Sequence, residues 1–231
     1  MTIRTELEDF VTKTLREQWV TRDGRVVPAT DDVALSNLAV TLDATVLYAD
    51  LAGSTQMVKG KKWHFSAEIY KTFLYASSRM IRHHDGTITA FDGDRVMGVF
   101  LGDSKNSNAA KAALRINWVA KELIQPAIKS QYPKSTYTLR HRVGIDTSTI
   151  HVIRAGVRGS NDLVWVSNAA NNAAKMAALD PVYPSYVSAA VYGRLNKEAK
   201  YSTKNGEDRW KDLGTQDLGY RIYGSTWWWS P

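Results

Sequence analysis

Two carboxylates stand where a buried strand is expected to end and where a hairpin is expected to turn. The apolar run VLYA at residues 46–49 predicts a strand that stops at Asp50, and the segment FDGDRV places Asp94 in a turn between two further strands. A buried carboxylate without a partner is costly. Two carboxylates that meet, together with phosphate oxygens, are the usual ligands of Mg²⁺ or Mn²⁺, and the carbonyl of Leu51 could add one more oxygen. Taken singly, each acid also fits an ordinary helix cap or a solvated turn.

A short flexible turn follows the first acid. Gly53, Ser54 and Thr55 lead from Asp50 toward the next predicted helix. The free N–H groups at the start of a helix can bind phosphate. Together with the acids, the turn indicates a ligand rich in phosphate.

The elements that must position these residues follow from hydrophobic periodicity. Helices are predicted over residues 5–20, 63–84, 104–130 (beginning with Ser104 as N-cap) and 168–179, and strands over 43–50, 87–91, 95–101, 137–145 and 149–154, with a Trp-rich strand at the C-terminus. Residues 21–36 form a polar connector. The core order of strand, helix, strand, strand, helix, strand predicts an α+β fold with a ferredoxin-like split βαβ antiparallel sheet and helices on one face.

Composition excludes several classes of protein. The chain has 231 residues, of which 44% are hydrophobic, enough for one substantial core. It has no cysteine, which excludes disulfides, thiolate zinc sites and a cysteine nucleophile. It shows neither an apolar signal core nor the roughly 18 consecutive apolar residues of a membrane span. We therefore expect a cytoplasmic protein without a membrane partner.

The net charge of +7 is spread along the chain, with KGKK at 59–62 as the only local cluster. A basic ferredoxin-like sheet could bind RNA, but such modules flank their strand aromatics with Lys and Arg. The segment TAFDGDRVMGVF instead carries two acids among its aromatics. We expect no nucleic-acid partner.

Four segments, in the order of the family, resemble the class III nucleotidyl cyclase domain. The stretch YADLAGST, residues 48–55, is similar to the family's first metal strand, aromatic-x-Asp-hydrophobic-x-Gly-aromatic-Thr. Gly93 and Asp94 resemble its Gly-Asp hairpin, and the strand VGIDTSTIHV resembles its Val-Gly-Ile-His-x-Gly segment. The stretch SNAANNAAK, residues 167–175, is similar to Gly-x-x-Val-Asn-x-Ala-x-Arg. The resemblance covers about residues 40–224 and implies residues 1–38 as an N-terminal helix and connector and 39–231 as the catalytic domain.

The resemblance implies a reaction. A nucleoside triphosphate binds with two divalent ions, Mn²⁺ or Mg²⁺, between Asp50 and Asp94. The ribose 3′-oxygen attacks the α-phosphorus and pyrophosphate leaves. Asn171 orients the ribose, although Asn172 is an adjacent second amide. Lys175 stabilises the charge on the phosphoryl group, where the family usually has Arg; Lys lacks the two-pronged fork of Arg.

The resemblance also implies a head-to-tail homodimer with active sites at the interface, because the family places its metal residues and its Asn and Arg on facing protomers. One chain here carries both halves, so a homodimer has two equivalent sites. The segment that holds the triphosphate tail in the family, WKDLGTQDLGYRIYG here, does not align cleanly. Lys211, Arg221 and Arg95 are candidates for that role, and each also fits an ordinary surface cation.

The base is the open question. Where adenylyl cyclases carry Lys and Asp, and guanylyl cyclases Glu and Cys, this chain has Ala90 and Val164, which cannot hydrogen-bond a purine. Phe91, Trp165 and Tyr48 add bulk nearby. These departures resemble the bacterial pyrimidine cyclases of Pycsar anti-phage systems, whose cyclic nucleotide activates a separate effector. UTP is favoured as substrate. A cytidylate cyclase, a divergent adenylyl cyclase and a degenerate nucleotide-binding or dimerisation module stay open, and the tail GSTWWWSP either covers the sheet or dimer interface or docks an effector.

Overall fold

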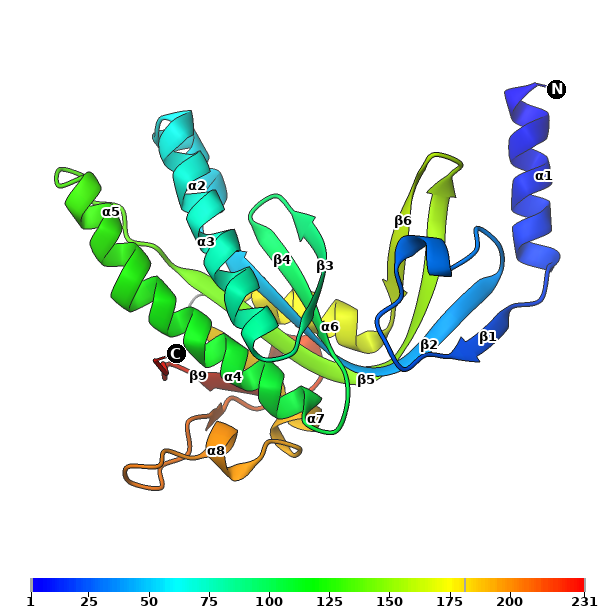
Figure 1. The fold of residues 1–231 in the computed structure, drawn as a ribbon. Helices are drawn as coiled ribbons and strands as arrows, with labels where there is room; N and C mark the ends of the chain where they lie inside the picture. Colours follow the sequence, from blue (N-terminus) through cyan, green and yellow to red (C-terminus); the bar gives the residue numbers. More distant parts are fainter. Residues whose placement is uncertain (1, 181, 231) are drawn as a thin grey trace. The chain divides into compact units, whose positions relative to one another are not determined.

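The structure is a computed structural model that describes residues 2–180 and 182–230. The chain divides into two compact units (Figure 1). Unit 1 comprises Met1–Asp43 and Thr149–Ser167, and unit 2 comprises Ala44–Ser148 and Asn168–Pro231. The strands β2 and β5 run through both units, and each unit is described by itself.

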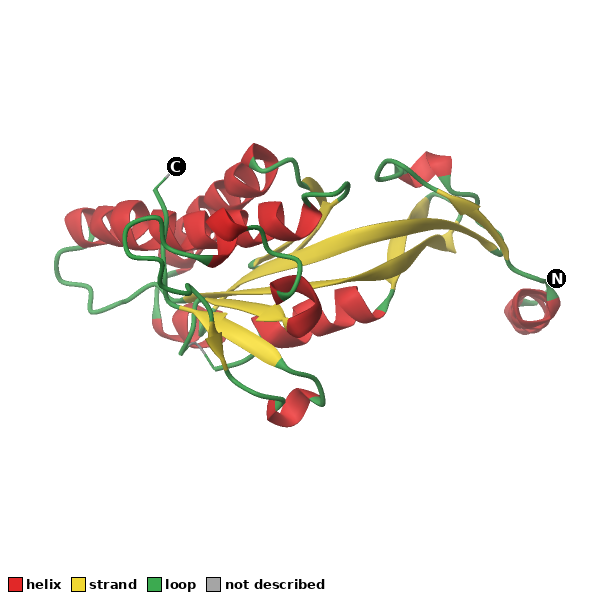
Figure 2. Ribbon diagram, turned by 90° about the horizontal axis from the view of Figure 1, so that it is seen from below, coloured by secondary structure: helices red, strands yellow, loops and turns green. Residues whose placement is uncertain are grey.

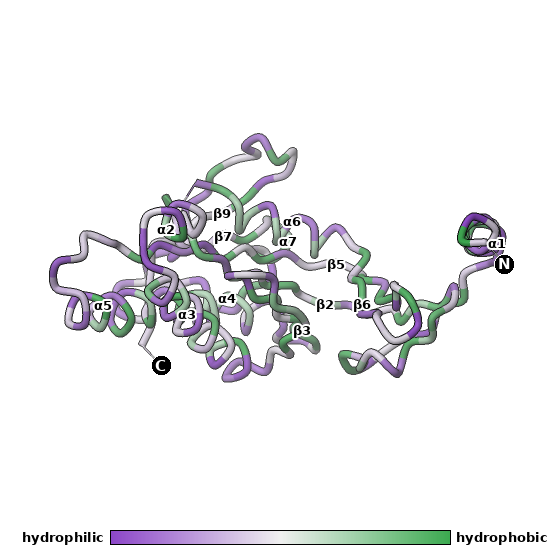
Figure 3. Tube along the Cα trace, turned by 90° about the horizontal axis from the view of Figure 1, so that it is seen from above, coloured by the Kyte–Doolittle hydropathy of each residue, from purple (hydrophilic) through white to green (hydrophobic). Residues whose placement is uncertain are grey.

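Unit 1 consists of one helix and paired strands. Its elements are α1 (Ile3–Arg16), β1 (Val20–Asp23), a 3-10 turn (Thr30–Asp32), the first part of β2 (Leu38–Leu51), the last part of β5 (His141–Val157) and β6 (Ser160–Val166). β1 pairs parallel with β2, and β6 pairs antiparallel with β5. The Thr2 hydroxyl caps α1 by accepting from the Thr5 N–H. The amphipathic helix predicted over residues 5–20 is present but spans Ile3–Arg16, and Val20 begins β1 instead. None of its side chains is buried, and it carries both hydrophobic and hydrophilic residues (Figure 3).

Unit 2 holds the central sheet, in the order β3-β4-β2-β5-β7-β9-β8. Its strands besides β2 and β5 are β3 (Thr87–Asp92), β4 (Arg95–Phe100), β7 (Ser185–Ser188), β8 (Lys211–Asp212) and β9 (Ile222–Ser225). Its helices are α2 (Ser54–Gly60), α3 (Trp63–His83), α4 (Lys105–Trp118), a π-helical segment (Val119–Ile124), α5 (Gln125–Gln131), α6 (Asn168–Ala177), α7 (Ala189–Tyr192), α8 (Lys197–Lys200) and a 3-10 turn (Gln216–Leu218). The single long helix predicted from residue 104 is thus three consecutive helical segments. Ser104 is its N-cap residue, although its side chain makes no capping hydrogen bond.

The sheet of unit 2 has helices on both faces. Alternate residues of β2 and β5, including Leu47, Ala49 and Ile145, join the core that contains α3 and α4 residues. The residues between them, such as Tyr48, face the other side, and there α6 packs against β5. The expectation of helices on one face is therefore wrong for α6, as Figure 2 also shows by the helices on either side of the strands.

The Trp-rich tail follows a strand rather than forming one, since β9 ends at Ser225. Trp227 and Trp229 pack against the core, and the Arg209 guanidinium lies 5.2 and 5.0 Å from their ring centroids. Trp228 is 46% exposed, with the Lys121 ammonium 3.4 Å from its ring centroid. The run therefore covers the unit's own core with two of its three indoles, and Pro231 at its end lies outside the described residues.

Candidate active site

Strand register brings the two predicted acids to one end of the sheet. Asp50 lies opposite Arg95 across β2 and β4, and Arg95 lies opposite Asp92 across β4 and β3. Asp94 directly precedes Arg95 in the turn, where Gly93 has a φ of 60° that favours glycine. The structure therefore places Asp50 and Asp94 together, as the sequence predicts.

The acid pair is electrostatically strained. Burial raises the pKa of Asp50 to about 6, and the charge of Asp94 adds to this effect, while Arg142 and Arg95 oppose it. The Oδ2 atom of Asp94 is buried and has no hydrogen-bond partner within the described part of the chain. A divalent cation between the two carboxylates would stabilise the charged form of Asp50 and would give Asp94 Oδ2 a partner.

Arg142 on β5 is a site residue that the sequence analysis missed. Its guanidinium donates to the Leu179 carbonyl at 2.6 Å and lies 3.5 Å from Asp50 Oδ2, and its side chain is only 14% exposed. The stretch RVGID carried a signal, because Arg142, Gly144 and Asp146 alternate with the core residues Val143 and Ile145. A strand that places charged residues at every second position faces a polar site on that side.

The turn after Asp50 runs beside the acid pair. Gly53 has a φ of 77°, and α2 begins at Ser54. The Ser54 hydroxyl hydrogen-bonds Tyr70, whose pKa is raised by burial and then by the charge of Asp94. The Leu51 side chain is 1% exposed, Thr55 is exposed, and a role for the Leu51 carbonyl as a ligand stays a prediction.

Among the candidate base-contact residues, Tyr48 and Ala90 lie on the same face of the sheet, with one strand, β4, between them. Tyr48 lies opposite Met97, and Ala90 pairs with the same Met97 from β3. The Arg95 guanidinium lies 5.3 Å from the Tyr48 ring centroid and donates to Asp92 at 2.6 Å. Burial raises the pKa of Tyr48. The Tyr48 hydroxyl and the Arg95 guanidinium are therefore polar groups close to the acids.

The other candidates of this group are less enclosed. Phe91 is 59% exposed. Val164 and Trp165 belong to unit 1, where β6 pairs them with Ile153 and Val152 of β5. A role for these three residues in base recognition stays a prediction.

Helix α6 separates the two adjacent amides. The Asn172 amide donates to Asp146 at 2.8 Å and is used inside the unit. Asn171 and Lys175 lie one turn apart, are both exposed, and make no side-chain interaction within the described residues. Asn171 is therefore the amide available to a ligand or a partner.

The candidate cations for the phosphate tail are dispersed. Lys211 is exposed on β8, which lies four strands from β2, about 19 Å at a strand spacing of roughly 4.8 Å. Arg221 pairs with Asp212 at 3.2 Å. The structure brings neither to Asp50 of the same chain, whereas Arg95 and Arg142 are both close to it.

Comparison with known proteins identifies the family. No family model matches the chain. It is 48% identical to a uridylate cyclase of Burkholderia cepacia over 100% of both chains, and 45% identical to one of Xanthomonas perforans over 99% of both. The chain belongs to the uridylate cyclase family. A third uridylate cyclase, from a Rhodovulum species, is 40% identical to this cyclase over 100% of the chain and 99% of the relative.

Solved structures confirm the predicted fold of the cyclase. A bacterial light-regulated adenylyl cyclase superposes with a TM-score of 0.68 at 18% identity, over 80% of this chain and 90% of the other. The guanylyl cyclase Cya2 gives 0.66 at 16% identity, over 83% and 95%. The α+β fold of class III cyclases is thus confirmed. The assignment as a nucleotidyl cyclase, a phosphorus–oxygen lyase, rests on the uridylate cyclase relatives. No helix in the described residues of the cyclase is long and apolar enough to cross a bilayer.

The raised pKa of Asp50 predicts that its negative charge lowers the stability of the folded protein at neutral pH. The pKa of Asp50 is about 6 in the folded cyclase and lies above the ordinary value of 3.8. As the pH rises, the Asp50 carboxyl therefore loses its proton at a lower pH in the unfolded cyclase than in the folded one. Stability contributed by the protonated form is therefore lost as the pH rises from about 4 to about 6. We expect Asp50→Asn to stabilise the metal-free cyclase at pH 7.5 by about 1–2 kcal/mol, after allowance for partial exposure, and to make no difference near pH 4.

Thermal unfolding in EDTA across this pH range measures the effect, with the exposed Asp103→Asn as control. A shift in Tm of about 2–8 °C is expected for a chain of this size. An Asp50→Asn variant no more stable than the parent at pH 7.5 would contradict the strained carboxylate.

Proposed function

We propose that the protein converts UTP to 3′,5′-cyclic UMP and pyrophosphate at sites shared between two protomers. The observation that carries the proposal is the acid pair, with its unpartnered Asp94 oxygen beside Asp50. Relatives named uridylate cyclase, 40–48% identical over the full length, support the choice of substrate. The test is incubation of pure protein with each ribonucleoside triphosphate and Mn²⁺, with products identified by mass. Absence of any cyclic nucleotide would overturn the proposal.

The acid pair fits two divalent ions, Mg²⁺ or Mn²⁺. Asp94 Oδ2 has no partner in the described part of the chain, and the contact of Asp50 with Arg142 is long at 3.5 Å. When bound, such ions lower the pKa of the ribose 3′-hydroxyl and neutralise the triphosphate. Asp50 and Asp94, with the Leu51 carbonyl, would hold them. Arg142 adds a positive charge at the same place for phosphate oxygens.

The reaction is a displacement at the α-phosphorus, and side chains of the protein orient the substrate and stabilise the developing charge. The 3′-oxygen bonds to the α-phosphorus, the bond from that phosphorus to the bridging oxygen breaks, and the hydroxyl proton passes to water. Asn171 orients the ribose, and Lys175 stabilises the charge that develops on the phosphoryl group. Ser54, with Gly53 and Thr55, lies beside the acids and lines the phosphates. Lys211 would reach the phosphate tail only from the facing protomer.

The head-to-tail homodimer is part of the proposal. Asn171 and Lys175 are exposed and make no side-chain contact within the described residues, so they are available to complete a site on another protomer. Each interface would then combine the acid pair of one chain with α6 of the other. Two equivalent sites result from a two-fold arrangement.

Mixing two inactive variants tests this arrangement. We expect Asp50→Ala mixed with Asn171→Ala to recover activity, because one site of each mixed dimer collects both lesions and the other collects neither. With random exchange about half of the dimers are mixed, and each has one intact site of two, so the ceiling is roughly a quarter of wild-type activity. The turnover of UTP is measured before and after exchange, with each variant alone as control. Exchange shown by mass without recovery of turnover would refute the shared site.

The base and the biological setting complete the proposal. The Tyr48 hydroxyl would meet uracil O4 or N3–H, and the position of the ring beside Arg95 supports this role. Cytosine swaps the acceptor at position 4 for a donor, so CTP is the main alternative substrate, and a divergent adenylyl cyclase is the other. Family resemblance supports cyclic UMP as an anti-phage signal read by a separate effector. The absence of cysteine supports a cytoplasmic location.

A further inference from the structure

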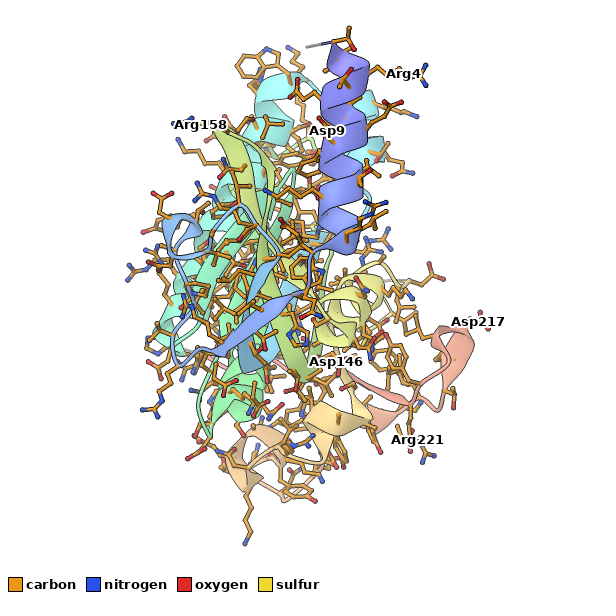
Figure 4. The ribbon with its side chains drawn as sticks, turned by 90° about the vertical axis from the view of Figure 1, so that its right-hand side faces the viewer. Arg4, Asp9, Asp146, Arg158, Asp217 and Arg221 are labelled. Atoms are coloured by element: carbon orange, nitrogen blue, oxygen red, sulfur yellow. The ribbon has the colours of Figure 1, made fainter. Side chains whose placement is uncertain are left out.

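We propose that Asp146 is a positioning residue that fixes the rotation of α6, and with it the direction of Asn171 and Lys175. The inference rests on the proposed function of those two residues. Asp146, labelled in Figure 4, lies on β5 and is 5% exposed. It accepts hydrogen bonds from the Asn172 amide at 2.8 Å and from the Ser188 hydroxyl at 2.5 Å. No ion pair within the described residues involves it.

The contact between β5 and α6 is made at three alternate residues of the strand. At Gly144 an added Cβ would lie 2.1 Å from the Ala173 carbonyl oxygen, so the strand and helix backbones touch. At Ser148 the hydroxyl accepts from the Ala169 N–H at 3.2 Å. Asp146 lies between these two positions on the same face of the strand.

These contacts engage one side of α6. At 100° per residue, Ala169, Asn172 and Ala173 share one face of the helix. Asn171 points to roughly the opposite face, about 150° from the centre of the first, and Lys175 points sideways, about 115° from that centre. The Gly144 contact sets the distance between helix and strand. The atoms that face Gly144 are mainly backbone atoms of the helix, so the Asp146–Asn172 bond is the contact between two polar side chains that sets the angle of the helix about its own axis.

Asn172 is held from two sides. Its amide binds Asp146, and its backbone carbonyl accepts from the Tyr220 hydroxyl at 3.2 Å. The Ser188 hydroxyl that donates to Asp146 also caps α7 by accepting from the Val191 N–H. Buried hydrogen bonds to a carboxylate are stronger than neutral ones. The network therefore ties α6 to elements on two sides, and loss of Asp146 frees the rotation of the helix.

A subunit-mixing experiment separates positioning from general damage. Asp146→Ala is expected to lower kcat for UTP by more than about tenfold while KM changes little, because the lesion acts on groups that stabilise the transition state. Mixed with Asp50→Ala, it should recover toward roughly a quarter of wild-type activity, as the Asp50→Ala and Asn171→Ala mixture does. Mixed with Asn171→Ala, it should recover nothing, because each of the two sites then carries one of the two lesions in its α6 half.

The outcomes are distinct. Recovery with Asn171→Ala, or no recovery with Asp50→Ala when the Asp50→Ala and Asn171→Ala reference mixture does recover, would overturn the assignment of Asp146. Failure of the reference mixture speaks against the shared site rather than against Asp146. For that case, an independent test exchanges the carboxylate and the amide between positions 146 and 172 of the same chain.

Asn172→Asp places two carboxylates in contact and should lower kcat by more than about tenfold. Adding Asp146→Asn restores a donor and an acceptor with their roles reversed, and the double variant should return to within about threefold of wild type. Thermal unfolding and gel filtration confirm that each variant is folded and unchanged in size. A double variant as slow as Asn172→Asp alone would overturn the proposal whatever the oligomeric arrangement.

Discussion

Asp50→Ala and Asp94→Ala are each expected to lower kcat by at least about 10³-fold while the protein stays folded. The two carboxylates are close together and would be stabilised by a cation between them. Asp94 Oδ2 has no hydrogen-bond partner in the described part of the chain, and the pKa of Asp50 is raised to about 6. Removing either acid removes a ligand of the ions that would hold the triphosphate. A loss of about 4 kcal/mol of transition-state stabilisation corresponds to this factor.

The measurement is the rate of cyclic nucleotide formation at saturating Mn²⁺, with thermal unfolding as a check of the fold. Asp103→Ala is the matched control, because that carboxylate is exposed just beyond the end of β4. Near-normal product formation by either acid variant would refute the metal assignment.

The second large effect concerns the base. We expect the enzyme to discriminate between UTP and the purine nucleotides by about 30- to 10⁴-fold in kcat/KM. Ala90 offers no hydrogen bond, so a purine next to it would leave ring nitrogens desolvated and unpaired, each at a cost on the order of 1–3 kcal/mol. Two such losses give the stated range. Uracil presents O4 and N3–H, which the Tyr48 hydroxyl can meet.

A competition among equal amounts of UTP, CTP, ATP and GTP decides the question. Cyclic AMP or cyclic GMP as the main product would overturn the pyrimidine assignment, and cyclic CMP would overturn only the choice of uridine. Tyr48→Phe keeps the ring over which Arg95 lies and removes the hydroxyl. We expect it to reduce the preference for UTP by about tenfold, as loss of one hydrogen bond would.

Local signals made part of this site predictable. Asp50 and Asp94 were found because a strand end and a hairpin turn are features of a few consecutive residues, and pairing of β2 with β4 then brings them together. The main helices followed from periodicity in the same way, but the strands predicted over 137–145 and 149–154 are one continuous strand, β5, and β6 was not predicted. On α6 the Asn172 amide has an internal partner, Asp146, and the assignment of Asn171 to the ribose stays a prediction.

Features that depend on contacts between distant segments were not predictable to the same degree. Arg142 was missed because its partner Asp50 lies 92 residues away. The side of the sheet that α6 covers depends on Gly144, a residue whose lack of a side chain matters only once a helix is packed on it. The tail was predicted as a strand from its aromatic composition, but its indoles stack on Arg209 after the strand has ended.

The Gly144 contact has a mechanical consequence. Most helices rest on a sheet through a layer of side chains, which can change rotamer and let the helix slide or tilt. At Gly144 the backbone of α6 lies directly on the backbone of β5, and the side chains beside this contact, Asp146 and Ser148, are held to the helix by hydrogen bonds. Within one protomer, α6 and the strand therefore move as a single rigid body. A regulator that alters the alignment of Asn171 with a partner's acid pair would have to move one whole protomer against the other.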